Sequence, residues 1–123
     1  MEESILLSVK KVLGLGPGYD VFDDDLMMHI NSTFSVLQQL GVGPVEGFFI
    51  DSPEAKWAEF TTPPVQLNLV KTYMTTKVKL LFDPPTTSFH LTAAKELIDQ
   101  YEWRLNVMRE NDIPIPEEEE VDP

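Results

Sequence analysis

The sequence predicts an all-α fold: a small helical bundle with a long helical hairpin at residues 65–82 and 87–109, an irregular aromatic-rich middle segment and an extended acidic C-terminal tail. Apolar residues recur every three or four positions in four segments, as one buried face of a helix requires. Proline and glycine separate these segments. With 123 residues, 42% of them hydrophobic, the chain can build one modest core, and no apolar run approaches the roughly 18 residues of a membrane span.

The first helix is expected within residues 3–13. Ser4 suits its start, and Lys10 and Lys11 suit the negative end of the helix dipole. Its apolar stripe is Ile5, Leu6, Val9, Val12 and Leu13. The following glycines, at 14–18, lack the lysine and Ser/Thr of a P-loop, so we interpret them as a helix-ending loop, not a phosphate cradle.

The second helix is expected to follow Asp23-Asp24-Asp25 and to end at Gly41. Calcium loops space their acidic ligands at alternate positions around a glycine turn, and three contiguous acids do not. We therefore interpret these acids as N-capping and favourable charge at a helix N-terminus. The expected buried stripe is Leu26, Met27, Ile30, Phe34, Leu37 and Leu40.

The middle of the chain, residues 42–60, combines little regular structure with many aromatic side chains. Residues 48–50 could form a strand-like piece, and Ser52 with Pro53 predicts the start of a short helix. Such long irregular loops are usually functional or disordered, and large aromatics do not suit disorder. These residues either complete the core or pack on another subunit. The second interpretation predicts an interface made by Phe48, Phe49, Ile50, Trp57 and Phe60.

The hairpin is predicted by two strong apolar stripes on either side of Asp83-Pro84-Pro85. The short connection favours antiparallel packing of the two helices. The first stripe is Leu67, Val70, Met74, Val78 and Leu81, and the second is Ala94, Leu97, Ile98, Tyr101, Leu105 and Met108. The residues predicted to be buried are Leu37, Val70, Met74, Leu97, Ile98 and Tyr101, and Leu97→Ala is expected to cost about 2–5 kcal/mol of stability.

Catalytic chemistry finds no support in the residue pattern. The chain has no cysteine, which excludes disulfides, thiolate metal ligands and cysteine nucleophiles. His29 and His90, the only histidines, lie in different predicted helices without metal-ligand spacing. There is no glycine pattern of a nucleophile elbow around any serine. We therefore expect no enzyme activity, no catalytic residues, no metal and no cofactor.

The charge is concentrated at the C-terminus. The net charge is −12, and seven of the 21 acidic residues lie in 110–123, which leaves 14 acids against 9 bases for residues 1–109. This predicts a single domain, 1–109, followed by an acidic tail, and it argues against general binding to nucleic-acid phosphates. Within the tail, Ile113-Pro114-Ile115-Pro116 is either a chance apolar stretch or a docking segment whose prolines restrict the backbone.

Several stretches together resemble the head-tail connector (adaptor, or head-completion) proteins of long-tailed phages and prophages. They are FDDDLMMHINSTFSVLQQLGVGP at 22–44, GFFI at 47–50 and the run from Asn68 to Asn106, and the resemblance covers residues 3–107. Its most specific parts are Asp23–Asp25 leading into Ile30-Asn31, then Leu40–Gly43, Lys79–Pro85 and Glu102–Leu105. The tail does not share in it.

The resemblance implies a structural virion protein of the neck, made in the host cytoplasm. Its helical protomers would form a ring, usually twelve-fold, under the portal, extend the DNA channel and present a docking surface for the next connector (stopper) or a tail terminator. DNA would pass through the lumen without sequence-specific binding, and no catalysis or cofactor is implied. The residues add an expectation that acids, more than Lys71, Lys77 and Lys79, line the lumen, because basic walls would bind sliding phosphates.

For the tail, we predict docking on the portal through Ile113, Pro114, Ile115, Pro116, Glu117 and Glu118. The alternative function is an acidic helical regulator that binds a basic, nucleic-acid-binding partner. Such a regulator would need its acids on the folded surface, whereas a third of them lie in the tail. The two functions differ in assembly: a connector forms a ring or binds a portal, and a regulator stays a monomer or dimer.

Overall fold

The computed structural model describes residues 3–112, and within the last helix it describes side chains up to residue 108. The elements are α1 (Ile5–Leu13), α2 (Asp23–Gln39), the short 3₁₀ helix η1 (Trp57–Glu59), α3 (Pro64–Phe82) and α4 (Ser88–Asp112). Residues 3–112 contain no β-strand, only an isolated antiparallel bridge between Ser4 and Lys56. The predicted all-α class is confirmed.

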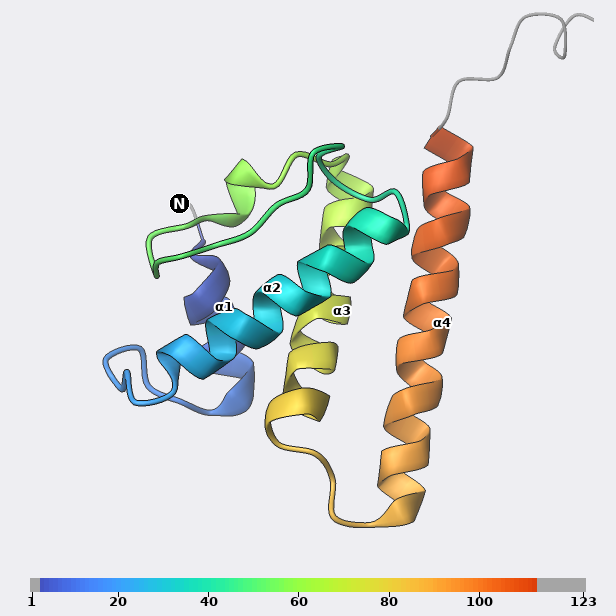
Figure 1. Cartoon of the computed structure of the whole chain (residues 1–123). Helices are drawn as coiled ribbons and strands as arrows, with labels where there is room; N and C mark the ends of the chain where they lie inside the picture. The colour runs from blue at the N-terminus through green and yellow to red at the C-terminus, as the bar shows by residue number, and fades with distance from the viewer. Residues whose placement is uncertain (1–2, 113–123) are drawn as a thin grey trace, which may run out of the picture.

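The central element is α3, which contacts each of the other three helices (Figure 1). The longest helix, α4, runs antiparallel to α3 after a short connection and packs chiefly against it. On the other side of α3, α2 crosses it obliquely, and α1 packs on both α2 and α3. Because α3 separates them, α1 and α4 lie on opposite sides of the molecule.

The core is built by apolar residues from all four helices and from the segment 42–60. Four of the six residues predicted to be buried are buried, and Tyr101 is half-buried. The prediction for Leu97 is wrong, because its side chain is 39% exposed. The buried face of α4 is centred on Ile98 and Leu105, and Leu97 lies about 100° around the helix from Ile98.

Two further stripe residues are also exposed, and a large buried aromatic residue lies outside the predicted stripe of α3. Val12 and Leu81 lie near the C-terminal ends of their helices, and both side chains are exposed. Tyr73 is fully buried on α3, where the sequence stripe places no core residue. The periodicity therefore located the helices correctly but set the width of each buried face only approximately.

We expect Ile98→Ala to lower the free energy of unfolding by about 2 kcal/mol, at the lower end for a buried aliphatic residue, because α4 packs chiefly on one helix, α3. The matched variant Leu97→Ala should change it by less than about 0.5 kcal/mol, as for a surface substitution. Urea unfolding followed by circular dichroism measures both. A larger loss for Leu97→Ala than for Ile98→Ala would contradict this register of α4.

Local signals at both ends of α1 agree with the sequence. The Leu7 N–H donates to the Ser4 hydroxyl oxygen at 3.2 Å, so Ser4 caps the helix. Gly14 ends it with φ of 80°, a left-handed conformation that favours glycine, and its N–H donates to backbone carbonyls of the last turn. The interpretation of residues 14–18 as a helix-ending loop is confirmed at Gly14.

Two boundary predictions are wrong. Asp23, Asp24 and Asp25 form the first turn of α2 and do not precede it, and the N-cap, Phe22, makes no side-chain capping bond. At the other end of the chain α4 continues to Asp112, so residues 110–112 are helical and do not belong to an extended tail. The remainder of the predicted tail, 113–123, lies outside the described residues. None of the helices in 3–112 has the length and apolar character needed to cross a bilayer.

Candidate interaction surfaces

The Asn31 side chain of α2 forms two hydrogen bonds with the backbone of the segment 42–60. The Asn31 side-chain Nδ2 donates to the Ile50 backbone carbonyl at 2.8 Å, and the Ile50 backbone N–H donates to Asn31 Oδ1 at 2.7 Å. These two bonds satisfy the backbone of Ile50 as a neighbouring strand would. The strand-like expectation for 48–50 is wrong, since no strand forms there and a helix side chain takes the place of the partner.

The aromatic residues of this segment pack around Phe34 of α2. The ring centroids of Phe48, Phe60 and Trp57 lie 5.0, 5.1 and 6.1 Å from that of Phe34. Glycine is needed at position 43 for two reasons. Its φ is +92°, which favours glycine, and an added Cβ atom would overlap the Phe60 ring. The cluster therefore completes the protomer core.

This packing corrects the predicted interface. Ile50, Trp57 and Phe60 are buried and Phe48 is half-buried, so the prediction that they are anchors for another subunit is wrong for the three buried side chains. Trp57 lies in the three-residue 3₁₀ helix η1, which forms in place of the short helix expected to start at Ser52 and Pro53. Phe49, by contrast, is 71% exposed, and its contact with a neighbour stays a prediction.

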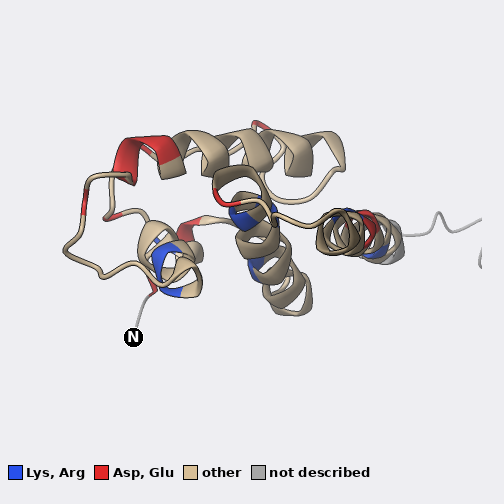
Figure 2. Ribbon diagram, turned by 90° about the horizontal axis from the view of Figure 1, so that it is seen from below, with Lys and Arg blue, Asp and Glu red and all other residues tan. Residues whose placement is uncertain are grey.

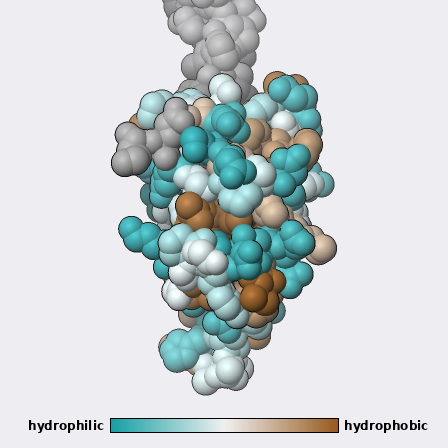
Figure 3. All heavy atoms as spheres, turned by 90° about the vertical axis from the view of Figure 1, so that its left-hand side faces the viewer, coloured by the Kyte–Doolittle hydropathy of each residue, from teal (hydrophilic) through white to brown (hydrophobic). Residues whose placement is uncertain are grey.

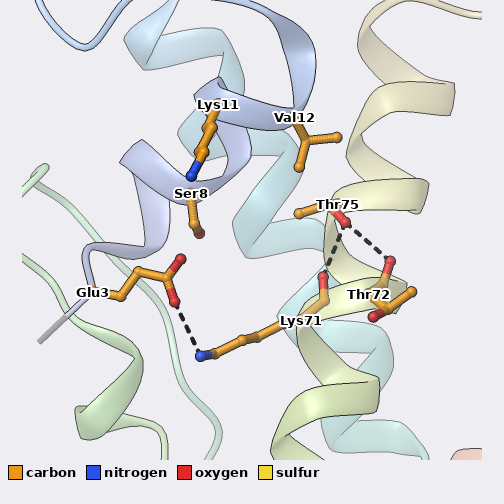
Figure 4. A pocket seen from close by; sticks show the side chains of 7 residues that line it. All are labelled: Glu3, Ser8, Lys11, Val12, Lys71, Thr72 and Thr75. Atoms are coloured by element: carbon orange, nitrogen blue, oxygen red, sulfur yellow. Dashed lines mark hydrogen bonds and ion pairs between the residues drawn. The ribbon is translucent and has the colours of Figure 1, made fainter.

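A hollow of about 490 Å³ opens between α1 and α3 (Figure 4). Lys71 crosses it to meet Glu3, with 3.0 Å between Nζ and Oε1. On the α3 side the Thr75 hydroxyl donates to backbone carbonyls of α3, so this hydroxyl already has its acceptors. The lining residues are Glu3, Ser8, Lys11, Val12, Lys71, Thr72 and Thr75.

A second hollow of about 370 Å³ lies on the outer side of α1 and shares Lys11 with the first. Its other lining residues, Leu7, Leu15 and Pro17, are apolar. Seen from the side of α1, the surface has apolar side chains gathered in its middle, with polar side chains around them (Figure 3). We call the surface formed by Leu7, Lys11, Val12, Leu15 and Pro17 the α1 face.

A polar contact fixes α4 on α3. The Tyr73 hydroxyl donates to Glu102 Oε2 at 2.8 Å, and Lys77 Nζ lies 3.6 Å from the same oxygen. Burial, together with the neighbouring Glu102 carboxylate, raises the pKa of Tyr73 well above its usual range. Tyr73 therefore remains a neutral hydrogen-bond donor at physiological pH, and the contact sets the position of α4 along α3.

The side of α4 that faces away from α3 also carries large apolar residues. Phe89 and Trp103 are 77% and 67% exposed, and their fourteen-residue separation, about four helical turns, puts them on one line. We call the surface formed by Phe89, Glu96, Gln100 and Trp103 the α4 face. The stripe of apolar residues that predicts the core of this helix does not include them, so the sequence analysis did not predict this surface.

Within the part of the chain that the structure describes, no three His, Cys, Asp or Glu side chains lie close enough to hold a metal ion. The acids of α2 form its first turn (Figure 2), where Asp23 pairs with Lys10 at 2.9 Å. The residues predicted to dock on the portal, 113–118, lie outside the described range.

The chain was compared with family models, curated proteins and solved structures. The model of the family described as phage connector protein matches residues 5–112, nearly the whole described range. No curated protein and no solved structure matches the chain. Since the match spans most of the 123 residues, the chain belongs to the phage connector protein family, a family of structural proteins of the bacteriophage virion.

Proposed function

We propose that this protein is a ring-forming head-to-tail connector (adaptor) that docks under the portal, extends the DNA channel and joins the capsid to the tail. The observation that carries the proposal is the family match over residues 5–112. The helical fold supports it further, because both α1 and α4 expose large apolar residues and these two helices lie on opposite sides of the molecule, as a head-to-tail ring needs.

The charge distribution supports passage of DNA without binding. Of the three lysines of α3 in question, Lys71 pairs with Glu3 and Lys77 lies near Glu102, so both meet carboxylates within the protomer. Among the three, Lys79 is the one that is exposed. We propose that the lumen carries more Asp and Glu than Lys and Arg, which lets phosphates slide past the wall.

We further propose that the segment 113–118 docks on the portal. Two isoleucines, each followed by proline, offer short apolar groups on a restricted backbone, so little conformational entropy is lost on binding. The run Glu117–Glu120 complements a basic groove and speeds association. Phe49, which is exposed within the segment 42–60, is proposed to contact the next connector or a tail terminator.

A chain ending at Asp112 tests the docking segment. It keeps every described helix, so it should remain folded and soluble, and it should bind the portal of its own phage at least tenfold more weakly than the full chain, about 1.4 kcal/mol. Raising salt should weaken binding of the full chain more than that of the truncated chain, because ions screen the acidic run. Binding is measured by surface-immobilised portal at several salt concentrations.

A full-length variant with Glu117–Glu120 changed to glutamine separates the two contributions. It should lose the salt dependence and keep the apolar contact. Equal affinity of the full and truncated chains would reject the docking segment. Electron microscopy of the full chain mixed with its portal tests the function itself, and a ring on the portal is the expected result. A monomer or dimer that does not bind the portal would favour the acidic regulator.

A further inference from the structure

Two apolar surfaces of the protomer have no partner within it. The α1 face offers a hollow lined by Leu7, Leu15 and Pro17, with Lys11 at its edge. The α4 face offers Phe89 and Trp103, both largely exposed. These faces lie on opposite sides of α3, α1 at the left and α4 at the right of Figure 1, and the view from below agrees (Figure 2).

The charges of the two faces are opposite. Glu96 lies midway between Phe89 and Trp103, seven residues from each, and therefore on the same line of α4. On α1, Lys11 borders both the apolar hollow and the neighbouring hollow of Figure 4. A carboxylate between two aromatic residues on one face thus matches an ammonium group beside an apolar hollow on the other.

These features select one mode of self-association over another. A two-fold dimer through the α4 face, centred between its aromatics, would place Glu96 against Glu96 of the second copy. A two-fold dimer through the α1 face would bring the two Lys11 side chains together. Like charges in contact oppose association, whereas a head-to-tail arrangement pairs Glu96 with Lys11 and buries aromatic side chains in the apolar hollow.

We infer that the α4 face of one subunit binds the α1 face of a second copy of this chain, with Trp103 in the hollow lined by Leu7, Leu15 and Pro17 and Glu96 paired with Lys11. The inference rests on the proposed ring and names the surfaces that close it. Trp103 is the main anchor, because tryptophan is enriched among interface hot spots, which lie in well-packed, desolvated pockets.

Charge exchange tests the pairing in the full-length protein. Lys11→Glu and Glu96→Lys should each weaken self-association at least tenfold, and the double variant should recover most of it, because the two charges then attract again. Association is measured by sedimentation of the protein alone and by counting rings on the portal in electron micrographs. Both side chains are exposed, so circular dichroism should show unchanged helicity.

A second pair of variants tests the anchor. Trp103→Ala should abolish rings at concentrations where the unaltered chain forms them. Met28→Ala, which removes an exposed apolar side chain of α2 outside both faces, should leave self-association unchanged. If rings form but none of the Lys11, Glu96 or Trp103 variants affects them, this interface is wrong and the connector function stands. If the unaltered chain forms no ring even on the portal, the proposed function fails, and the interface fails with it.

Discussion

Replacing Trp57 by alanine is expected to lower the free energy of unfolding by about 3–5 kcal/mol, a large share of the stability of a small domain. The side chain is 2% exposed and packs edge-on against Phe34. Its indole N–H donates to the Ser8 hydroxyl at 2.9 Å, and this bond ties the segment 42–60 to α1. The substitution removes both the ring and the bond, so urea unfolding followed by circular dichroism should show an earlier transition.

Phe49→Ala is the matched control, since it removes an aromatic side chain of the same segment from an exposed position. It should change the free energy of unfolding by no more than about 0.5 kcal/mol. The comparison decides between the two interpretations of the aromatic residues. If Trp57→Ala keeps full stability and impairs only assembly, Trp57 is an interface anchor after all and its burial in the protomer is wrong.

The helices could be predicted because their signals are local. Apolar stripes and flanking prolines predicted where α3 and α4 begin. Each predicted first residue differs from the observed one by a single position. The error at Leu97 arose because Leu97 and Ile98 are adjacent aliphatic residues. Periodicity alone does not decide which of two neighbours faces the core when the helix packs on a single partner.

The middle segment could not be predicted, because large aromatic residues suit a core and an interface equally well. Contacts between distant parts of the chain place these residues in the core. Examples are the hydrogen bonds of the Asn31 side chain with Ile50 and the close approach of Phe60 to Gly43. Asn31 and Gly43 both lie in the stretches that resemble connector proteins, yet no local rule assigns either of them a partner.

The sequence carries a pattern that indicates the α4 face. Phe89, Glu96 and Trp103 are spaced seven residues apart on one helix. The apolar stripe that predicts the buried face of this helix does not include them. Two aromatics on the side opposite the core indicate a second apolar surface. The α1 face had no such signal, because its hollow is formed by Leu15 and Pro17 of the loop together with Leu7 of the helix.

Removing the carboxylate of Asp23 is the other change with a large expected effect. Lys10, which the sequence predicts near the C-terminal end of the first helix, is 1% exposed, and its Nζ lies 2.9 Å from Asp23 Oδ1. The ammonium group also donates to the Pro17 carbonyl at 3.2 Å, so it joins α1, the loop and α2. Asp23→Ala leaves a buried charge with one backbone acceptor, which should cost about 3 kcal/mol.

Asp24→Ala is the control for Asp23→Ala, because Asp24 shares the first turn of α2 and is exposed. It loses only the favourable interaction with the helix dipole, about 0.3–1 kcal/mol. The double variant Lys10→Met with Asp23→Leu should recover most of the stability lost in Asp23→Ala, since it removes both charges and keeps apolar volume at the site. Chemical denaturation of the four proteins at one pH measures these differences. If Asp23→Ala and Asp24→Ala lose the same amount, the ion pair contributes nothing beyond the charge of the first turn, and the role assigned to Lys10 is wrong.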